Sequence, residues 1–476
     1  MPNLSRREWL STLASAPLLT SAAQARRPNI VFVLTDDQGY GDIAALGNPV
    51  VKTPNLDRLH GQSVRFVDHH ASPTCSPTRA SIMTGRHEFK SGVTHTILER
   101  ERMSLKATTI AQVLKTAGYS TGIFGKWHLG DAAPYQPGRR GFDEVFIFGC
   151  GGIGQDYPGT CADAPGNRYF DPVILHNGVF EKTRGYCTDV FFDRGTKWIG
   201  EQRNSGAPFF AYIATNAPHE PLDCPEDYRR LYQGMNLDDH TARYFGMVTN
   251  IDDNVGRLMG RLKEWGMDRD TLLIFMTDNG GTGGVRVFNA GMRGAKATPY
   301  QGGTRVPLFV RWTGTWEPRD VKRLTGAIDL FPTVAGIAGA PIPPGLQLDG
   351  RSLLPLLQNH RAPWPDRYLF THVGRWERGR ALESKYAACR VRSPRFSMVS
   401  PGPQKKWELY DLDADPGEKN DVLAAFPAVA KPMEEAYDRW WADIVPCLEN
   451  EDAVPPKVAP YKELYWKQFG GGPRSS

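Results

Sequence analysis

Four short runs of apolar and β-branched residues, each ending in polar side chains, constrain the fold of this chain more than any other feature. The runs cover residues 29–35, 120–124, 208–214 and 271–277. Nearly continuous apolar runs of this length are typical of strands buried on both faces, as in parallel sheets covered by helices. Helical patterns lie between the runs, for example at 108–117 and 244–265. The sequence therefore predicts an α/β fold with a mainly parallel central sheet flanked by helices.

The polar residues that follow these runs predict one shared site. Ligand sites in such sheets lie beyond the carboxyl ends of the strands. The residues found there are Asp36 and Asp37, Lys126 and His128, His219, and Asp278 and Asn279. We therefore expect these side chains to come together, although they are far apart in the sequence.

Two of these strand ends carry oxygen-rich pairs that favour a metal ion. Asp36-Asp37 and Asp278-Asn279 offer three carboxylates and one amide oxygen, with no His or Cys alongside. This ligand set suits a hard cation such as Ca²⁺ or Mg²⁺. Each pair alone is also common in turns that follow strands, so the metal hypothesis depends on both pairs and on the cysteine motif described next.

The segment Cys75-Ser76-Pro77-Thr78-Arg79, followed by Thr84-Gly85-Arg86, resembles the signature of the type I, formylglycine-dependent sulfatases. In that family the cysteine is oxidised after synthesis to formylglycine, whose hydrated aldehyde attacks the sulfur of a sulfate ester. The resemblance implies that a maturation enzyme converts Cys75 into this formylglycine. Thr78 and Met83 stand where Ser and Leu are usual, and Thr78 lies within the segment that the maturation enzyme reads.

Further segments extend the resemblance over residues 28–418. They surround Lys126 and His128, His219, the stretch from Arg293 to Lys296, and the two acidic pairs. The resemblance implies an alkaline-phosphatase-like fold and one Ca²⁺ whose shell the formylglycine completes. Its implied protein ligands are Asp36, Asp37, Asp278 and Asn279. The segment 149–156 does not align with the family, so no residue is assigned there.

The resemblance also implies catalytic roles for five side chains besides Cys75. Arg79 and Lys126 would hold and polarise the formylglycine hydrate. His128 would assist as a base near its hydroxyls. His219 and Lys296 would bind sulfate, and one of them would protonate the leaving oxygen. The implied covalent cycle has two steps. One hydroxyl of the diol attacks sulfur and the protonated alcohol leaves; the second hydroxyl then loses its proton, the aldehyde re-forms and sulfate is expelled.

These features indicate a sulfuric ester hydrolase, arylsulfatase-like, that acts on a sulfated small molecule or glycan. Two alternatives stay open. A phosphoester or phosphonate hydrolase of the same superfamily would use the same Arg, Lys and metal groups, and an anion-binding protein with an unmodified Cys75 would be catalytically silent. A two-zinc phosphatase fits worse, because it needs a Ser or Thr nucleophile and a second set of His and Asp ligands. A carbohydrate substrate is expected from the family and from predicted export.

Residues 1–25 carry the three parts of a twin-arginine signal peptide. Arg6-Arg7 is followed by an apolar stretch at 10–22 and by Ala23-Gln24-Ala25, a small-x-small cleavage site. The apolar stretch is too short to span a bilayer, and no later stretch is long and apolar enough. We expect export by the Tat translocase to the periplasm or outside the cell. Since this route carries folded proteins, Cys75 would have to be modified before export.

Length, charge and cysteine content add further expectations. We expect a catalytic domain at 26–365 and a smaller α+β subdomain at 366–476. In the subdomain, strand patterns lie at 368–371, 386–392, 396–400 and 407–412, an amphipathic helix is predicted at 432–444, and the tail beyond 465 is expected to be mobile. The net charge of +5 permits an anionic substrate, but no basic cluster is dense enough to predict nucleic-acid binding.

The six cysteines besides Cys75 have no C-x-x-C spacing, which argues against a zinc site. In an oxidising compartment we expect pairing, first among the four cysteines between Cys150 and Cys224.

Overall fold

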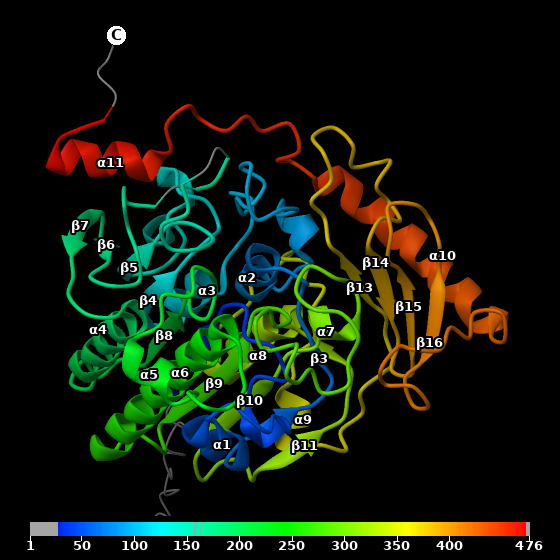
Figure 1. Cartoon of the computed structure of the whole chain (residues 1–476), viewed down its shortest axis with the longest axis horizontal. Coiled ribbons are helices and arrows are strands. Elements are labelled where there is room, and N and C mark those ends of the chain that lie inside the picture. Colours follow the sequence, from blue (N-terminus) through cyan, green and yellow to red (C-terminus); the bar gives the residue numbers. More distant parts are fainter. Residues whose placement is uncertain (1–26, 157–158, 162, 473–476) are drawn as a thin grey trace, which may run out of the picture.

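The structure is a computed structural model that describes residues 27–156, 159–161 and 163–472 (Figure 1). The signal peptide expected at 1–25 lies outside these residues. A ten-stranded sheet crosses the main body of the molecule. Its strands follow the order β11 (Arg319–Val321), β2 (Val64–Phe66), β10 (Leu308–Trp312), β9 (Thr271–Thr277), β1 (Asn29–Thr35), β8 (Phe209–Ala214), β4 (Ser120–Lys126), β5 (Glu144–Phe148), β6 (Val173–His176) and β7 (Val179–Lys182).

The centre of this sheet is parallel and its margins are mixed. The neighbours from β9 through β1, β8 and β4 to β5 all pair in parallel. Antiparallel pairs join β10 to β9 and to β2 on one side, and β5 to β6 and β6 to β7 on the other. The predicted α/β fold is confirmed, and all four apolar runs form central strands. Among the marginal strands, β6 and β7 form a hairpin closed by a two-residue connection, which is possible only for antiparallel strands.

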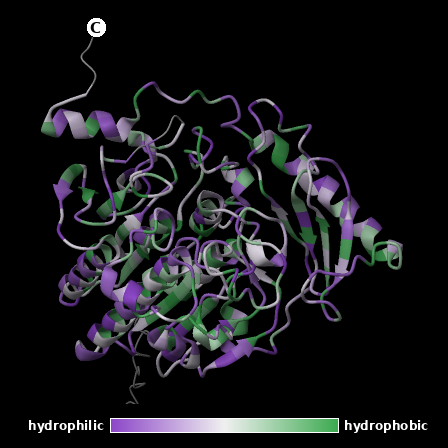
Figure 2. Ribbon diagram, in the orientation of Figure 1, coloured by the Kyte–Doolittle hydropathy of each residue, from purple (hydrophilic) through white to green (hydrophobic). Residues whose placement is uncertain are grey.

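Helices cover both faces of the sheet and create two separate hydrophobic cores. Alternate residues of β1 point to opposite faces: Ile30, Phe32 and Leu34 lie in one core, while Val31 and Val33 lie in the other. The first core contains residues of α2 (Cys75–Thr84), α3 (Ile110–Thr116) and α8 (Leu330–Ala338). The second contains residues of α1 (Pro54–Gly61), α4 (Cys187–Gln202) and α6 (Asp239–Glu264). Figure 2 shows the hydrophobic colour concentrated in the central strands.

The remaining helices of the main body are short: α5 (Glu226–Arg230), α7 (Gln301–Thr304) and α9 (Leu354–Gln358). The two helices predicted from periodicity are present. Helix α3 begins after Thr109, which forms a capping box with Gln112. Helix α6 begins five residues before the expected start at 244, because Asp238 caps it by accepting a hydrogen bond from the Thr241 amide.

A smaller C-terminal unit adds a second sheet. Strands β13 (Leu369–His372), β14 (Cys389–Arg392), β15 (Phe396–Ser400) and β16 (Glu408–Asp411) form an antiparallel meander. Helix α10 (Pro427–Ile444) packs on one face through Met433, Tyr437 and Trp441. This helix begins five residues before the predicted Pro432, since Pro427 also suits a first helical position.

After α10 the chain crosses the molecule and ends in α11 (Pro460–Phe469), which lies beside β7 (Figure 1). The Gln468 side chain accepts a hydrogen bond from the Phe180 amide at 2.7 Å and donates one to its carbonyl at 2.8 Å. Tyr465 packs against the Phe180 ring. The expectation of a mobile tail beyond 465 is therefore wrong for residues 466–469, which belong to this docked helix.

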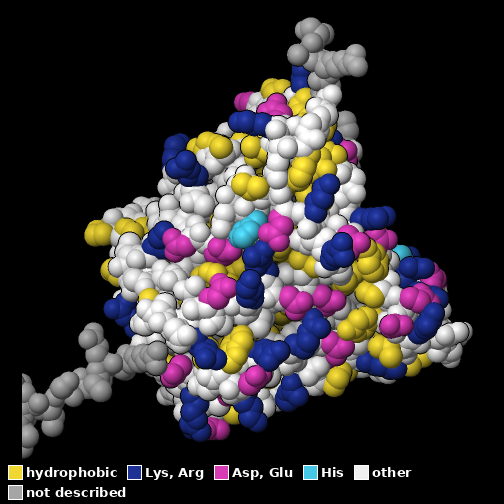
Figure 3. All heavy atoms as spheres, turned by 90° about the vertical axis from the view of Figure 1, so that its left-hand side faces the viewer, with side chains coloured by type: hydrophobic (Ala, Val, Ile, Leu, Met, Phe, Trp, Pro, Cys, Tyr) yellow, Lys and Arg dark blue, Asp and Glu magenta, His cyan; other side chains and the backbone are white. Residues whose placement is uncertain are grey.

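All seven cysteines lie within the described residues and none forms a disulfide, so the expected pairing is wrong. Among the described residues, no helix combines the length and the apolar character needed to cross a bilayer. Figure 3 shows basic and acidic side chains interspersed on the face that carries α11 and β7. An example is the ion pair between Arg194 and Glu181 at 2.6 Å.

We expect Gly125→Ala to destabilise the protein by about 3 kcal/mol. Gly125 has a φ of +110°, and a Cβ atom there would lie 1.9 Å from the carbonyl oxygen of Ala214 on the adjacent strand β8. Denaturant unfolding followed by fluorescence would measure the loss. Gly118→Ala is the matched control, because φ is +79° but no atom lies within 4 Å; we expect about 1 kcal/mol there. Equal losses in both variants would contradict the steric explanation.

Candidate active site

Strand register brings the two acidic pairs together. Strands β1 and β9 are parallel neighbours with Thr35 opposite Thr277, so Asp36-Asp37 and Asp278-Asn279 leave the sheet side by side. All four side chains are buried. One oxygen from each of Asp36, Asp37 and Asp278 lies within 4.8 Å of the other two. The convergence predicted from the strand ends therefore occurs.

The backbone at Asp37 is held in an unusual conformation. Its φ is +62°, in the left-handed region that non-glycine residues seldom adopt. Tyr244 donates its hydroxyl to the Asp37 carbonyl at 2.7 Å and to the Asp42 carboxylate at 2.6 Å. Such strain is common where a side chain must be aimed at a functional site.

The donor set fits a hard divalent cation. Burial raises the pKa of Asp36 to about 6 although Lys126 opposes it, and burial with the charge of Asp36 raises the pKa of Asp278. Within the described residues, Asp36 Oδ1 and Asn279 Oδ1 are buried without a hydrogen-bond partner. A cation bound by these oxygens would satisfy the unpartnered atoms and favour the ionised carboxylates.

Cys75 is the first residue of α2 and is almost completely buried. Pro77 lies in the first turn of this helix, where the missing backbone N–H of proline costs no hydrogen bond. The Sγ atom lies 3.5 Å from Nδ1 of His128. Burial alone would raise the pKa of the thiol, but Lys126 and Lys296 lower it below its usual value. The partial positive charge of a helix N-terminus acts in the same direction.

Each carboxylate of the cluster has its own cation. Arg79 donates to Asp278 at 2.8 Å and to the Lys126 carbonyl at 3.1 Å. Lys126 pairs with Asp36. Lys296 pairs with Asp37 at 2.6 Å; burial opposes its charge, but Asp37 raises the Lys296 pKa above its ordinary value.

Three carboxylates facing three cations balance in charge. A divalent ion held by the carboxylates would make the site net positive, which suits an anionic substrate.

Hydrogen bonds to backbone carbonyls fix the tautomers of both histidines. His128 Nε2 lies 2.8 Å from the Thr96 carbonyl, which can only accept, so Nε2 carries the proton and Nδ1 presents a lone pair to Cys75. Burial and then Lys126 lower the His128 pKa well below its usual value. His219 Nδ1 donates to the Glu220 carbonyl at 2.7 Å, and its Nε2 lies 3.7 Å from Asp37.

Two residues that the sequence left unassigned lie against these histidines. A Cβ atom at Gly151 would lie 3.0 Å from the His128 ring, and one at Gly152 would lie 2.9 Å from the His219 ring. Only glycine therefore fits there without displacing a ring. The two consecutive glycines are the sequence signal that could have marked this position. Nothing in the neighbouring sequence indicates that they contact His128 and His219.

Comparison with known proteins identifies the family. The Sulfatase family model matches residues 28–340, and the model of the N-sulphoglucosamine sulphohydrolase C-terminal region matches residues 295–438. The chain belongs to the sulfatase family. This sulfatase is therefore a sulfuric ester hydrolase, as the cysteine motif predicts, and its central sheet and C-terminal sheet are those of the family.

Individual relatives resemble this sulfatase over most of its length. Human (Homo sapiens) arylsulfatase A is 30% identical, covering 88% of this chain and 88% of its own. Arylsulfatase G of Mus musculus is 32% identical, covering 71% of this chain and 70% of its own. The crystal structure of Ps i-CgsB in complex with k-i-k-neocarrahexaose is 27% identical, with a TM-score of 0.80 over 93% of this chain and 97% of that one.

Proposed function

We propose that this sulfatase hydrolyses a sulfate monoester of a carbohydrate, with a formylglycine derived from Cys75 as nucleophile and one Ca²⁺ at the carboxylate cluster. The observation that carries the proposal is the 3.5 Å contact between Cys75 Sγ and the unprotonated Nδ1 of His128. The Sγ atom stands in for the hydroxyl of a hydrated formylglycine, which would supply both the nucleophile and the route for sulfate release. The cation, held by Asp36, Asp37, Asp278 and Asn279, would supply positive charge for the oxygens of the ester.

The other side chains divide into a group around the nucleophile and a group around sulfate. His128 is neutral and presents a lone pair at Nδ1, so it can take the proton of the attacking hydroxyl. Arg79 and Lys126 fix the positions of two carboxylates and place positive charge beside residue 75.

His219 and Lys296 both face Asp37. We assign sulfate binding to this pair, with one of them giving a proton to the leaving oxygen. The side chain of His219 is 12% exposed and that of Lys296 is 16% exposed, so both are accessible to a substrate.

Two relatives support a carbohydrate substrate. The N-acetylgalactosamine-6-sulfatase of Rattus norvegicus is 31% identical over 77% of this chain. Ps i-CgsB, whose fold agrees over 93% of this chain, binds a neocarrahexaose. We further propose export by the Tat translocase to the periplasm or outside the cell, after a formylglycine-generating enzyme has acted. This rests on the twin arginines and cleavage site of residues 1–25.

One experiment tests the nucleophile and the ester class together. The protein is produced in cells that mature sulfatases, and its tryptic peptide containing residue 75 is weighed. In parallel, turnover of 4-nitrophenyl sulfate and 4-nitrophenyl phosphate is compared. We expect the aldehyde mass and a kcat/KM at least about 10²-fold higher for the sulfate.

A preference for the phosphate would indicate a phosphoester hydrolase instead. An unmodified thiol, with a control sulfatase matured in the same cells, would reject the formylglycine mechanism and favour a catalytically silent anion-binding protein.

A further inference from the structure

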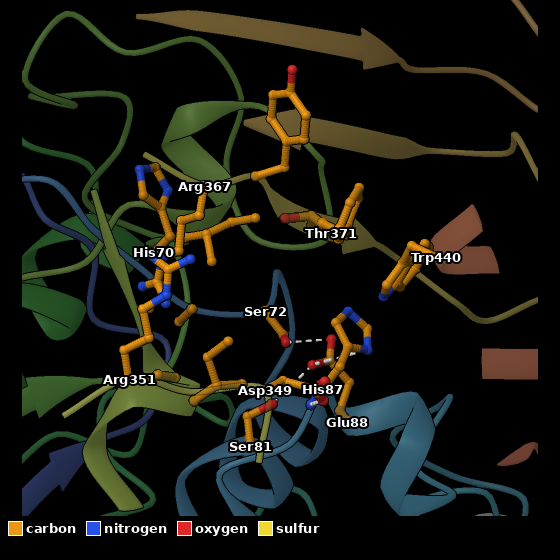
Figure 4. Close-up of a pocket in the computed structure, with 17 residues that line it drawn as sticks. His70, Ser72, Ser81, His87, Glu88, Asp349, Arg351, Arg367, Thr371 and Trp440 are labelled. Carbon is orange, nitrogen blue, oxygen red and sulfur yellow. Dashed lines mark hydrogen bonds and ion pairs between the residues drawn. The ribbon is translucent and has the colours of Figure 1, made fainter. Parts of the chain in front are cut away.

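A cavity of about 200 Å³ lies between the main body and the C-terminal sheet, apart from the site described above (Figure 4). Its walls come from the segment before α2, from α2 itself, from β13 and from α10. The lining residues that matter here are Ser72, Ser81, His87, Arg351, Thr371 and Trp440. None of the ten residues predicted for catalysis or metal binding lines it.

The two carboxylates that line the cavity already have partners. Glu88 accepts hydrogen bonds from the hydroxyls of Ser72 at 2.5 Å and Ser81 at 2.9 Å. Asp349 pairs with Lys90 at 2.9 Å and accepts from the backbone amide of His87 at 2.8 Å. The cavity therefore offers few free acceptors to a ligand.

One buried donor in the same cavity, Nε2 of His87, has no partner among the described residues. His87 Nδ1 accepts from the Phe89 amide at 3.3 Å and lies farther, 3.6 Å, from the Glu88 carboxylate, so in the neutral ring Nε2 carries the proton. That Nε2 is buried without a partner among the described residues, and His87 as a whole is only 7% exposed. A buried donor without an acceptor is costly, which points to a ligand or water that supplies one.

At the other end of the cavity, Arg351 lies near Asp329 but forms no ion pair with it. The Arg351 guanidinium donates to the Pro365 carbonyl at 2.7 Å, and Asp329 pairs with Arg367 instead. No ion pair of Arg351 occurs within the described part of the chain. Figure 4 shows Arg351 on one side of the cavity and His87 with Trp440 on the opposite side, with Ser72 and Thr371 between them.

The wall beside His87 is aromatic. Trp440 stacks on Phe370 with ring centroids 5.1 Å apart and an interplanar angle of 12°. The rings of His87 and Trp440 have centroids 4.8 Å apart and an interplanar angle of 68°. Flat rings in the ligand would pack on such a surface.

We propose that this cavity binds a small aromatic hydroxy acid, with its carboxylate at Arg351 and its hydroxyl oxygen at His87 Nε2. The carboxylate supplies the charge that Arg351 lacks, and the hydroxyl oxygen accepts from the unpartnered donor. The flat ring lies between them against Trp440. A cavity of this size takes a ligand smaller than most drug-like molecules.

Calorimetric titration with 4-hydroxybenzoate tests the proposal. We expect measurable binding that is at least about tenfold tighter than that of 4-hydroxybenzyl alcohol, which lacks the carboxylate, and tighter than that of benzoate, which lacks the hydroxyl. Arg351→Gln should weaken the binding of 4-hydroxybenzoate at least about tenfold. Arg323→Gln removes the same charge from an exposed position outside the cavity and should change nothing.

The ligand comparison in the unmodified protein remains decisive even if Arg351→Gln folds poorly. Equal binding of the acid and the alcohol would overturn the proposal. A second result would also overturn it: inorganic sulfate displaces 4-hydroxybenzoate, while Arg351→Gln leaves its affinity unchanged. That result would place the acid in the catalytic site.

Discussion

Replacement of Cys75 by alanine is expected to lower kcat toward 4-nitrophenyl sulfate by about 10⁴-fold or more. The side chain at this position is the group that faces Nδ1 of the neutral His128. Without it, the cations could still bind sulfate, so we expect KM to change much less than kcat. Steady-state kinetics on protein from maturing cells would measure both constants.

A second cysteine provides the matched control. Cys447 lies in the C-terminal unit, is partly exposed, and its Sγ has only a weak 3.9 Å contact with the Asp443 carbonyl. Cys447→Ala should keep full activity. If Cys75→Ala retained more than about a hundredth of the activity, a nucleophile at residue 75 would be ruled out.

Asp36→Asn is expected to reduce activity by about 10³-fold and to weaken Ca²⁺ binding. The change keeps the shape of the side chain but removes one negative charge from the three-carboxylate cluster and leaves Lys126 without its partner. Metal content by mass spectrometry and Ca²⁺ titration by calorimetry would measure the loss of the ion. Excess CaCl₂ should restore part of the activity if weakened binding is the cause.

Asp42→Asn is the control for this prediction. Asp42 is as deeply buried as Asp36 and lies close in the chain, but it is bound by Tyr244 and by the Gly39 amide rather than by the cluster. We expect it to keep its metal and most of its activity. Equal loss of metal in both variants would indicate general damage to the loop after β1.

The parts of the site that follow strand ends could be predicted, because parallel strands deliver their next residues to one place. Asp36 and Asp278 are 242 positions apart, yet the register of β1 and β9 makes them neighbours. The short strands of the C-terminal sheet were also predicted, since each has its own apolar pattern and turn.

The contacts that could not be predicted depend on packing between distant segments. Nothing near Thr96 in the sequence shows that its carbonyl fixes the tautomer of His128. The Gly151-Gly152 pair similarly acquires its importance only where it meets both histidines. Helix α11 was missed because its anchor, Phe180, is 288 positions before Gln468.

The contact between Gln468 and Phe180 also covers an edge of the large sheet. Strand β7 is the last of the large sheet, so its outward backbone groups are a template on which a strand of another molecule could pair. The side-chain amide of Gln468 makes the two hydrogen bonds that such a strand would make, one with the N–H and one with the C=O of Phe180. A strand of another molecule would have to displace helix α11 before it could pair with the backbone of Phe180.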